Sequence, residues 1–97
     1  MSMREKILRK LDALKPELKA RFNVREIGLF GSFVREEEME TSDIDILVEF
    51  EKPIGFFKFM ELEEYLELQL KRKVDLVSKK ALKPFIGQYI LEEVITA

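Results

Sequence analysis

The feature that most constrains the fold is a strand pattern that carries two carboxylates, SDIDILVEF, at residues 42–50. Side chains alternate between the two faces of a strand, so Asp43 and Asp45 project together from one face, which also carries Leu47 and Glu49. The opposite face is apolar and carries Ile44, Ile46, Val48 and Phe50. Strands that pack against a core rarely carry carboxylates without a reason. The segment therefore predicts a sheet with one apolar face that packs on the core and an opposite face whose carboxylates have a functional role.

Helix and strand patterns alternate along the first third of the chain. Apolar residues at helical spacing predict a helix over residues 3–21, which Pro16 should break or restart, with its exit at Asn23. A strand is expected over residues 24–30, where Gly28 would let another backbone or a ligand approach closely. Gly31 then permits a tight turn, and Ser32 is expected to cap a short helix over residues 33–37.

The rest of the chain continues this alternation. A helix is expected over residues 56–71, a strand over residues 73–78 and a last helix over residues 83–95, with Pro84 in its first turn. The apolar stripe of the middle helix would be formed by Phe56, Phe59, Leu62, Leu66 and Leu70. The order predicts an α/β (α+β) fold: a small mixed sheet of three or slightly more strands, flanked by about four helices. Residues 1–97 are expected to form a single domain.

Composition narrows the chemistry. The chain has no histidine and no cysteine, so it offers no imidazole base, no Ser-His triad and no thiolate metal site. Its net charge of −2 argues against direct nucleic-acid binding. The chain has no apolar run of the length that a membrane span needs, and its charged start lacks the apolar core of a signal peptide. We expect a cytoplasmic protein, with a homo- or hetero-oligomer left open.

Three aspartates and a glycine turn suggest a phosphate-handling site. If the strand over residues 73–78 lies beside the strand over residues 42–50, Asp75 joins Asp43 and Asp45. Adjacent carboxylates repel each other, and Mg²⁺, which prefers oxygen ligands, relieves that repulsion. The turn at Gly31 and Ser32 offers backbone N–H groups and a hydroxyl to an anion. Together these features describe a site for metal-assisted attack on a nucleoside triphosphate.

The glycine turn and the aspartate pair together resemble the signature of a known family. Gly31-Ser32, ten intervening residues and Asp43-Ile44-Asp45 resemble the signature of the DNA polymerase β-like nucleotidyltransferase superfamily. The wider string LFGSFVRE…SDIDILV, followed by KVDLVS, is similar to the minimal nucleotidyltransferases, which are small prokaryotic proteins usually paired with a HEPN-type ribonuclease toxin. The string that follows the turn departs from the family's frequent Gly-Ser-x-Ala-Arg-Gly, with Val34 in place of Ala and Glu36 in place of the last Gly.

The resemblance implies a role for each matching residue. Asp43, Asp45 and Asp75 would be the catalytic, Mg²⁺-binding carboxylates. Gly31, Ser32, Arg35 and Asp43 would bind the nucleotide, with ATP as donor. The implied activity is that of an antitoxin that transfers AMP to a hydroxyl, expected to be a tyrosine, of a cognate HEPN toxin. Asp75 is the candidate to accept the hydroxyl proton.

Alternatives remain for the function and for single residues. The chain could be an antitoxin that masks its toxin without turnover, or an enzyme that modifies a small hydroxylated molecule. The aspartates could be a solvated strand edge, Ser32 only a cap and Arg35 only a surface charge, and the acidic run at residues 36–40 reads as a solvated loop. Phe57 and the last helix near Tyr89 are the candidate contacts for a partner that docks over the site.

Overall fold

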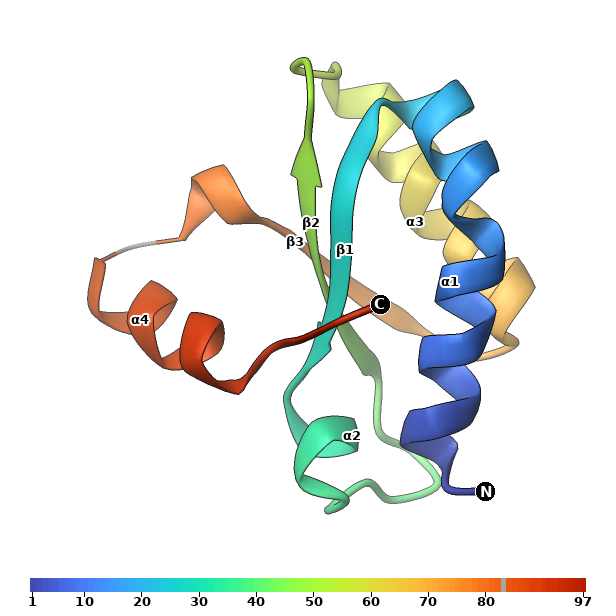
Figure 1. Ribbon diagram of the computed structural model, residues 1–97, viewed down its shortest axis with the longest axis vertical. Coiled ribbons are helices and arrows are strands. Elements are labelled where there is room, and N and C mark those ends of the chain that lie inside the picture. The colour runs from blue at the N-terminus through green and yellow to red at the C-terminus, as the bar shows by residue number, and fades with distance from the viewer. Residues whose placement is uncertain (83) are drawn as a thin grey trace.

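The fold alternates helices and strands around one mixed sheet (Figure 1). The computed structural model describes residues 1–82 and 84–97. Its elements are α1 (Met3–Phe22), β1 (Val24–Phe30), α2 (Ser32–Arg35), β2 (Ile44–Phe50), α3 (Phe56–Leu70), β3 (Val74–Ser78), the short 3₁₀ turn η1 (Lys79–Ala81), α4 (Pro84–Glu93) and β4 (Ile95–Thr96). The predicted fold class is therefore confirmed. Lys83, the expected start of the last helix, lies outside the described residues.

The sheet has four strands in the order β3-β2-β1-β4. β2 and β3 are parallel, and β1 is antiparallel to both of its neighbours, β2 and β4. The helix α3 connects the two parallel strands, as a parallel pair requires. The sequence patterns predicted helix up to residue 95, but the chain ends instead in β4, which pairs with β1 at Gly28 and Leu29. A strand of two residues is too short to produce a period in the sequence.

The sheet has one covered face and one face that is only partly covered. α1 and α3 lie side by side on the first face, and α4 stands on the other (Figure 1). The main core lies under α1 and α3; its fully buried residues include Leu11, Leu18, Phe22, Ile46 and Leu62. On the other face Phe30 and Leu47 are also buried, outside this main core. That second face is the one from which Asp45 projects, because residues i and i+2 of a strand share a face.

Some local predictions were wrong. The helix α1 runs through Pro16 without a break, because Leu11 and Leu18, both fully buried, anchor it on either side of the proline. Gly31, rather than Ser32, is the residue that precedes the first turn of α2, and Ser32 is the first helical residue. Phe56 does not belong to the apolar stripe of α3, since it is 71% exposed at the start of that helix.

No helix in the described part of the chain is both long and apolar enough to cross a membrane. That residues 1–97 form a single domain stays a prediction.

Candidate active site

The three predicted aspartates lie at one end of the sheet. Asp45 and Asp75 are register partners across the parallel strands β2 and β3, so their side chains project from the same face of strands about 4.8 Å apart. Asp43 lies immediately before β2 and two residues from Asp45. Asp43 and Asp75 are exposed, whereas Asp45 is partly buried. The strand alternation that predicted a shared face for Asp45 and Asp75 is therefore found in the structure.

Electrostatics set Asp45 apart from its neighbours. Burial, followed by the negative charges of Asp75 and Asp43, raises the pKa of Asp45 to about 6. Glu93 adds to this effect, and the positive charge of Arg35 opposes it. A carboxylate in such surroundings gains from any cation that binds nearby, because the cation removes the repulsion between the charged groups.

The turn at Gly31 lies directly against Asp45. Gly31 has a φ of 78°, a backbone conformation that side chains with a Cβ rarely adopt. A Cβ atom at this position would come within 2.1 Å of the Oδ2 atom of Asp45. Glycine is therefore required here both by the backbone conformation and by the close approach of the carboxylate. The turn that was predicted to hold phosphates thus lies next to the central aspartate.

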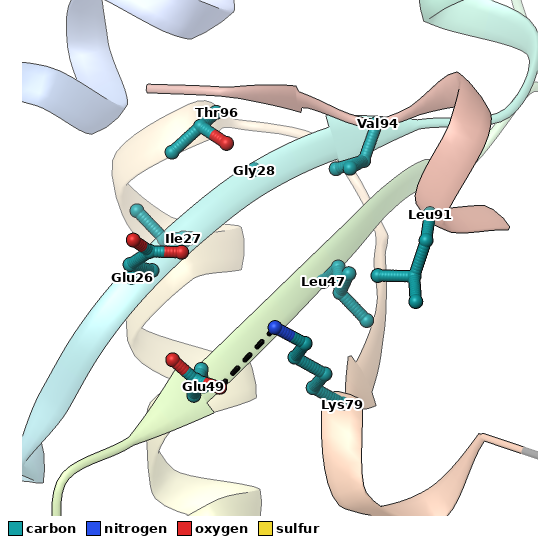
Figure 2. Close-up of a pocket in the computed structure, with 9 residues that line it drawn as sticks. All are labelled: Glu26, Ile27, Gly28, Leu47, Glu49, Lys79, Leu91, Val94 and Thr96. Atoms are coloured by element: carbon teal, nitrogen blue, oxygen red, sulfur yellow. Dashed lines mark ion pairs between the residues drawn. The ribbon is translucent and has the colours of Figure 1, made fainter. Parts of the chain in front are cut away.

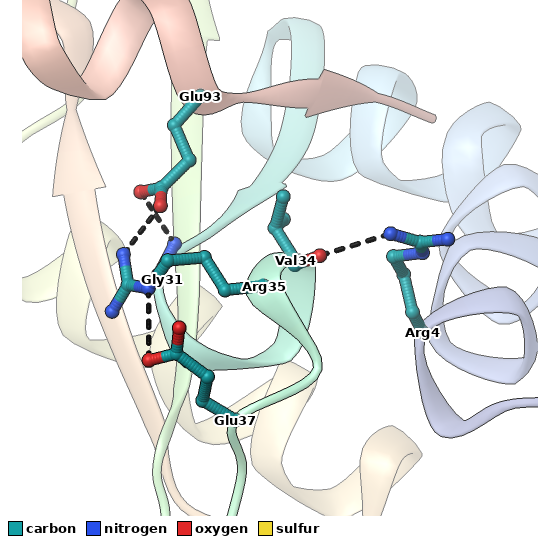
Figure 3. Close-up of polar contacts among 6 residues, drawn as sticks. All are labelled: Arg4, Gly31, Val34, Arg35, Glu37 and Glu93. Atoms are coloured by element: carbon teal, nitrogen blue, oxygen red, sulfur yellow. Dashed lines mark hydrogen bonds and ion pairs between the residues drawn. The ribbon is translucent and has the colours of Figure 1, made fainter.

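An acidic residue from the last helix reaches into this turn (Figure 3). The backbone N–H of Gly31 donates a hydrogen bond to Oε2 of Glu93, with the two atoms 3.0 Å apart. Arg35 forms an ion pair and a hydrogen bond with the other oxygen of Glu93, and its Nε atom lies 3.4 Å from Glu37. The hydrogen bond to Glu93 raises the pKa of Arg35 above its usual value. Sequence reasoning missed Glu93, because 62 positions separate it from Gly31 and no motif marks it.

Two arginines fix the loops that carry these groups. Arg4 of α1 donates a hydrogen bond of 2.9 Å to the carbonyl of Val34, and its guanidinium lies 3.6 Å from Glu36 (Figure 3). Arg72 donates to the carbonyls of Met39, Glu40 and Ser42, in the loop that leads from α2 to Asp43. The acidic run at residues 36–40 is thus exposed for much of its length, as predicted, and contacts with Arg4 and Arg72 hold its two ends.

A cavity of about 190 Å³ continues the same face of the sheet beyond Asp45 (Figure 2). Leu47 of β2, Leu91 of α4 and Val94, which follows α4, line the cavity. Glu49 and Lys79, whose charged atoms are 3.3 Å apart, border it. Because Glu26 also lines this cavity, its carboxylates disfavour phosphate, and the groups suited to an anion lie at the Gly31 end.

Asp43, Asp45 and Asp75 offer a metal ion carboxylate oxygens as ligands. Within residues 1–82 and 84–97, no three acidic side chains are already arranged around one point as ligands of a metal ion. The chemistry of the donors nevertheless suits Mg²⁺, because the site gathers carboxylate oxygens and because Asp43 and Asp75 both add to the negative charge around Asp45. Asp43, Asp45 and Asp75 therefore remain the predicted ligands.

Comparisons with known proteins agree with this architecture. The nucleotidyltransferase domain matches residues 11–96. The protein adenylyltransferase MntA of Thermococcus cleftensis is 56% identical over 85 residues, which cover 88% of this chain and 86% of that protein. A solved structure described as a minimal nucleotidyltransferase aligns with a TM-score of 0.78 at 34% identity, covering 98% of this chain and 95% of that one.

A crystal structure of a toxin-antitoxin with AMP-PNP aligns with a TM-score of 0.75 at 26% identity, over 91% of this chain and 69% of that one. The domain match over residues 11–96 and the relative at 56% identity decide the family. This chain belongs to the nucleotidyltransferase domain family, and it is an enzyme of the minimal nucleotidyltransferase type.

Proposed function

We propose that this chain is an antitoxin that transfers AMP from ATP to a hydroxyl, a tyrosine, of a cognate HEPN-type toxin. The observation that carries the proposal is the pairing of Asp45 with Asp75 beside the Gly31 turn. The relative at 56% identity is named a protein adenylyltransferase, and a structural neighbour is a toxin-antitoxin with AMP-PNP. Both names support a protein acceptor over a small molecule.

Each part of the site has a task in this reaction. The Gly31–Ser32 turn and Arg35 bind the triphosphate through N–H groups and positive charge. Asp43, Asp45 and Asp75 would hold Mg²⁺, which supplies positive charge for the phosphate oxygens when it is bound. The acceptor oxygen bonds to the α-phosphorus, the bond from that phosphorus to the oxygen bridging to the β-phosphate breaks, and pyrophosphate leaves. The exposed carboxylate of Asp75 accepts the hydroxyl proton.

The experiment follows label from [α-³²P]ATP into the toxin in the presence of Mg²⁺. Wild-type protein should label a hydroxyl residue of the toxin, and mass spectrometry should locate the added AMP on a tyrosine. Asp45→Asn should abolish labelling, while binding to the toxin stays measurable by calorimetry. Asp12→Asn serves as the matched control, because Asp12 is an exposed residue of α1 that pairs with Lys15, and this variant should label at the wild-type rate.

A second outcome would identify a different mechanism of the same antitoxin. If Asp45→Asn neutralises the toxin as well as the wild type does and no label is transferred by either protein, neutralisation occurs by masking. In that case the aspartates are not catalytic, and the transfer reaction proposed above is wrong for this protein.

A further inference from the structure

We infer that Glu93 is a built-in competitor of the nucleotide: its carboxylate occupies two of the groups that would bind the triphosphate, and ATP must displace it. The inference rests on the proposed function for the location of the triphosphate. It adds a regulatory contact that the family signature, which lies between Gly31 and Asp75, does not contain. The last turn of α4 would thereby set the affinity of the enzyme for its donor.

The contacts of Glu93 are those of an anion in a binding site (Figure 3). One carboxylate oxygen accepts the N–H of Gly31 at 3.0 Å, and the other accepts from the guanidinium of Arg35. The side chain of Glu93 is only 23% exposed, whereas that of Arg35 is 49% exposed. Glu93 is therefore partly buried against the turn, and it uses two of the groups that the sequence had assigned to the nucleotide, the N–H of Gly31 and the guanidinium of Arg35.

The surrounding charges disfavour the position of the Glu93 carboxylate, so a triphosphate can displace it. Glu93 brings a further negative charge toward Asp45, which already experiences the charges of Asp43 and Asp75, so the repulsion between Glu93 and Asp45 opposes this position. Glu37 also competes for Arg35. A triphosphate offers more negative charge and more acceptor oxygens than one carboxylate, and Mg²⁺ offsets the repulsion from the aspartates. One N–H cannot be fully shared by both anions, so binding of one excludes the other.

The contacts of the residues that follow Glu93 allow its side chain to move by itself. Val94 and β4 hold the end of α4 against β1: a Cβ on Gly28 would lie 2.7 Å from Val94, and the N–H of Ala97 donates to Ile27 at 2.9 Å. These contacts do not involve the carboxylate of Glu93. The side chain can therefore leave the turn while β4 stays paired.

Calorimetric titration with ATP and Mg²⁺ tests the inference without the toxin. Glu93→Gln keeps the size of the side chain and removes its charge, and Glu92→Gln is the matched control, because Glu92 is the exposed neighbour on the same helix. If Glu93 fills the turn in about nine molecules of ten, its removal should tighten the apparent Kd about tenfold, since binding is weakened by the fraction of competent molecules. Glu92→Gln should change the Kd by less than about twofold, as expected for an exposed charge.

Further measurements keep the test decisive. Glu93→Ala should tighten binding in the same direction as Glu93→Gln, and a thermal melt of each variant verifies that it is folded. In NMR spectra the amide signal of Gly31 should shift on addition of Mg²⁺ and ATP to the wild type, and it should already be displaced in ATP-free Glu93→Gln. Weaker or unchanged affinity for ATP in both Glu93 variants, each shown by its melt to be folded, overturns the inference, as does the loss of ATP binding in both. Tighter binding without label transfer leaves the inference standing and contradicts only the proposed reaction.

Discussion

Asp45 gives the clearest prediction for a single residue. Its pKa in the folded protein is about 6, above the ordinary 3.8. Between these two pH values the folded protein keeps the Asp45 proton, whereas the unfolded chain has released it. Asp45 therefore contributes stability below pH 4 that is lost as the pH rises through 6. In EDTA, the free energy of unfolding of the wild type should fall over this range more steeply than that of Asp45→Asn.

At pH 7 we expect Asp45→Asn to be more stable than the wild type by about 1 kcal/mol, a value that allows for solvent screening at a partly exposed group. Urea unfolding at pH 4 and at pH 7 measures the difference, with Asp12→Asn as the control. A variant that is less stable than the wild type at pH 7 would mean that the Asp45 carboxylate has a structural role.

Gly31 gives a second prediction, because both its φ of 78° and its contact with Asp45 exclude a side chain. Gly31→Ala should lose about 1–3 kcal/mol of unfolding free energy, the usual range for a strained backbone. Gly55→Ala is the matched control, since Gly55 has a φ of −72° and no atom within 4 Å of its would-be Cβ. Equal losses in urea unfolding of the two variants would contradict this account of the turn.

The helices and strands differ in how far the sequence predicts them. α1 and α3 were predicted to within one residue at either end, because their apolar residues repeat at the helical period, and β1 was predicted at its observed bounds, between Asn23 and Gly31. The sequence predicted that Asp75 would join Asp45 if β3 lay beside β2, and the structure places these two residues as register partners. β4 and the contact of Glu93 with Gly31 could not be predicted, because both depend on where the chain returns after α4, which local patterns do not encode.

The loop between α2 and β2 depends on one side chain from outside it. Arg72 donates to three of its carbonyls, at distances of 3.1–3.3 Å, and lies over the ring of Phe33. Arg72→Ala should lower the free energy of unfolding by about 1–3 kcal/mol, the range for losing hydrogen bonds from a charged group. Hydrogen exchange should rise at the N–H of Ser42, which bonds to Met39. Arg9→Ala, at an exposed position of α1, should change neither the unfolding free energy nor the hydrogen exchange of Ser42. If Arg72→Ala has no larger effect than Arg9→Ala, the loop does not depend on Arg72.

Two of the large exposed apolar side chains, Phe57 and Tyr89, lie at separate places in the protein. Phe57, which is 85% exposed, lies in the first turn of α3, after the far end of β2 from Asp45. Tyr89, which is 76% exposed, lies one helical turn before Glu93 on α4. Figure 1 shows the start of α3 and the turn at α2 at opposite ends of the sheet. Of the two predicted partner contacts, only Tyr89 is therefore on an element that reaches the site.

This separation predicts which contact a docking acceptor uses. A toxin that presents its hydroxyl to Asp75 must cover the site end of the sheet, so Tyr89→Ala should weaken toxin binding by about tenfold, the usual cost of losing a central aromatic anchor. Phe57→Ala removes a side chain of similar size and exposure at the opposite end, and it should change the Kd by less than about twofold. Calorimetric titration of the toxin into each variant measures both values. A larger loss for Phe57→Ala than for Tyr89→Ala would place the main contact of the toxin on α3 and would contradict this prediction.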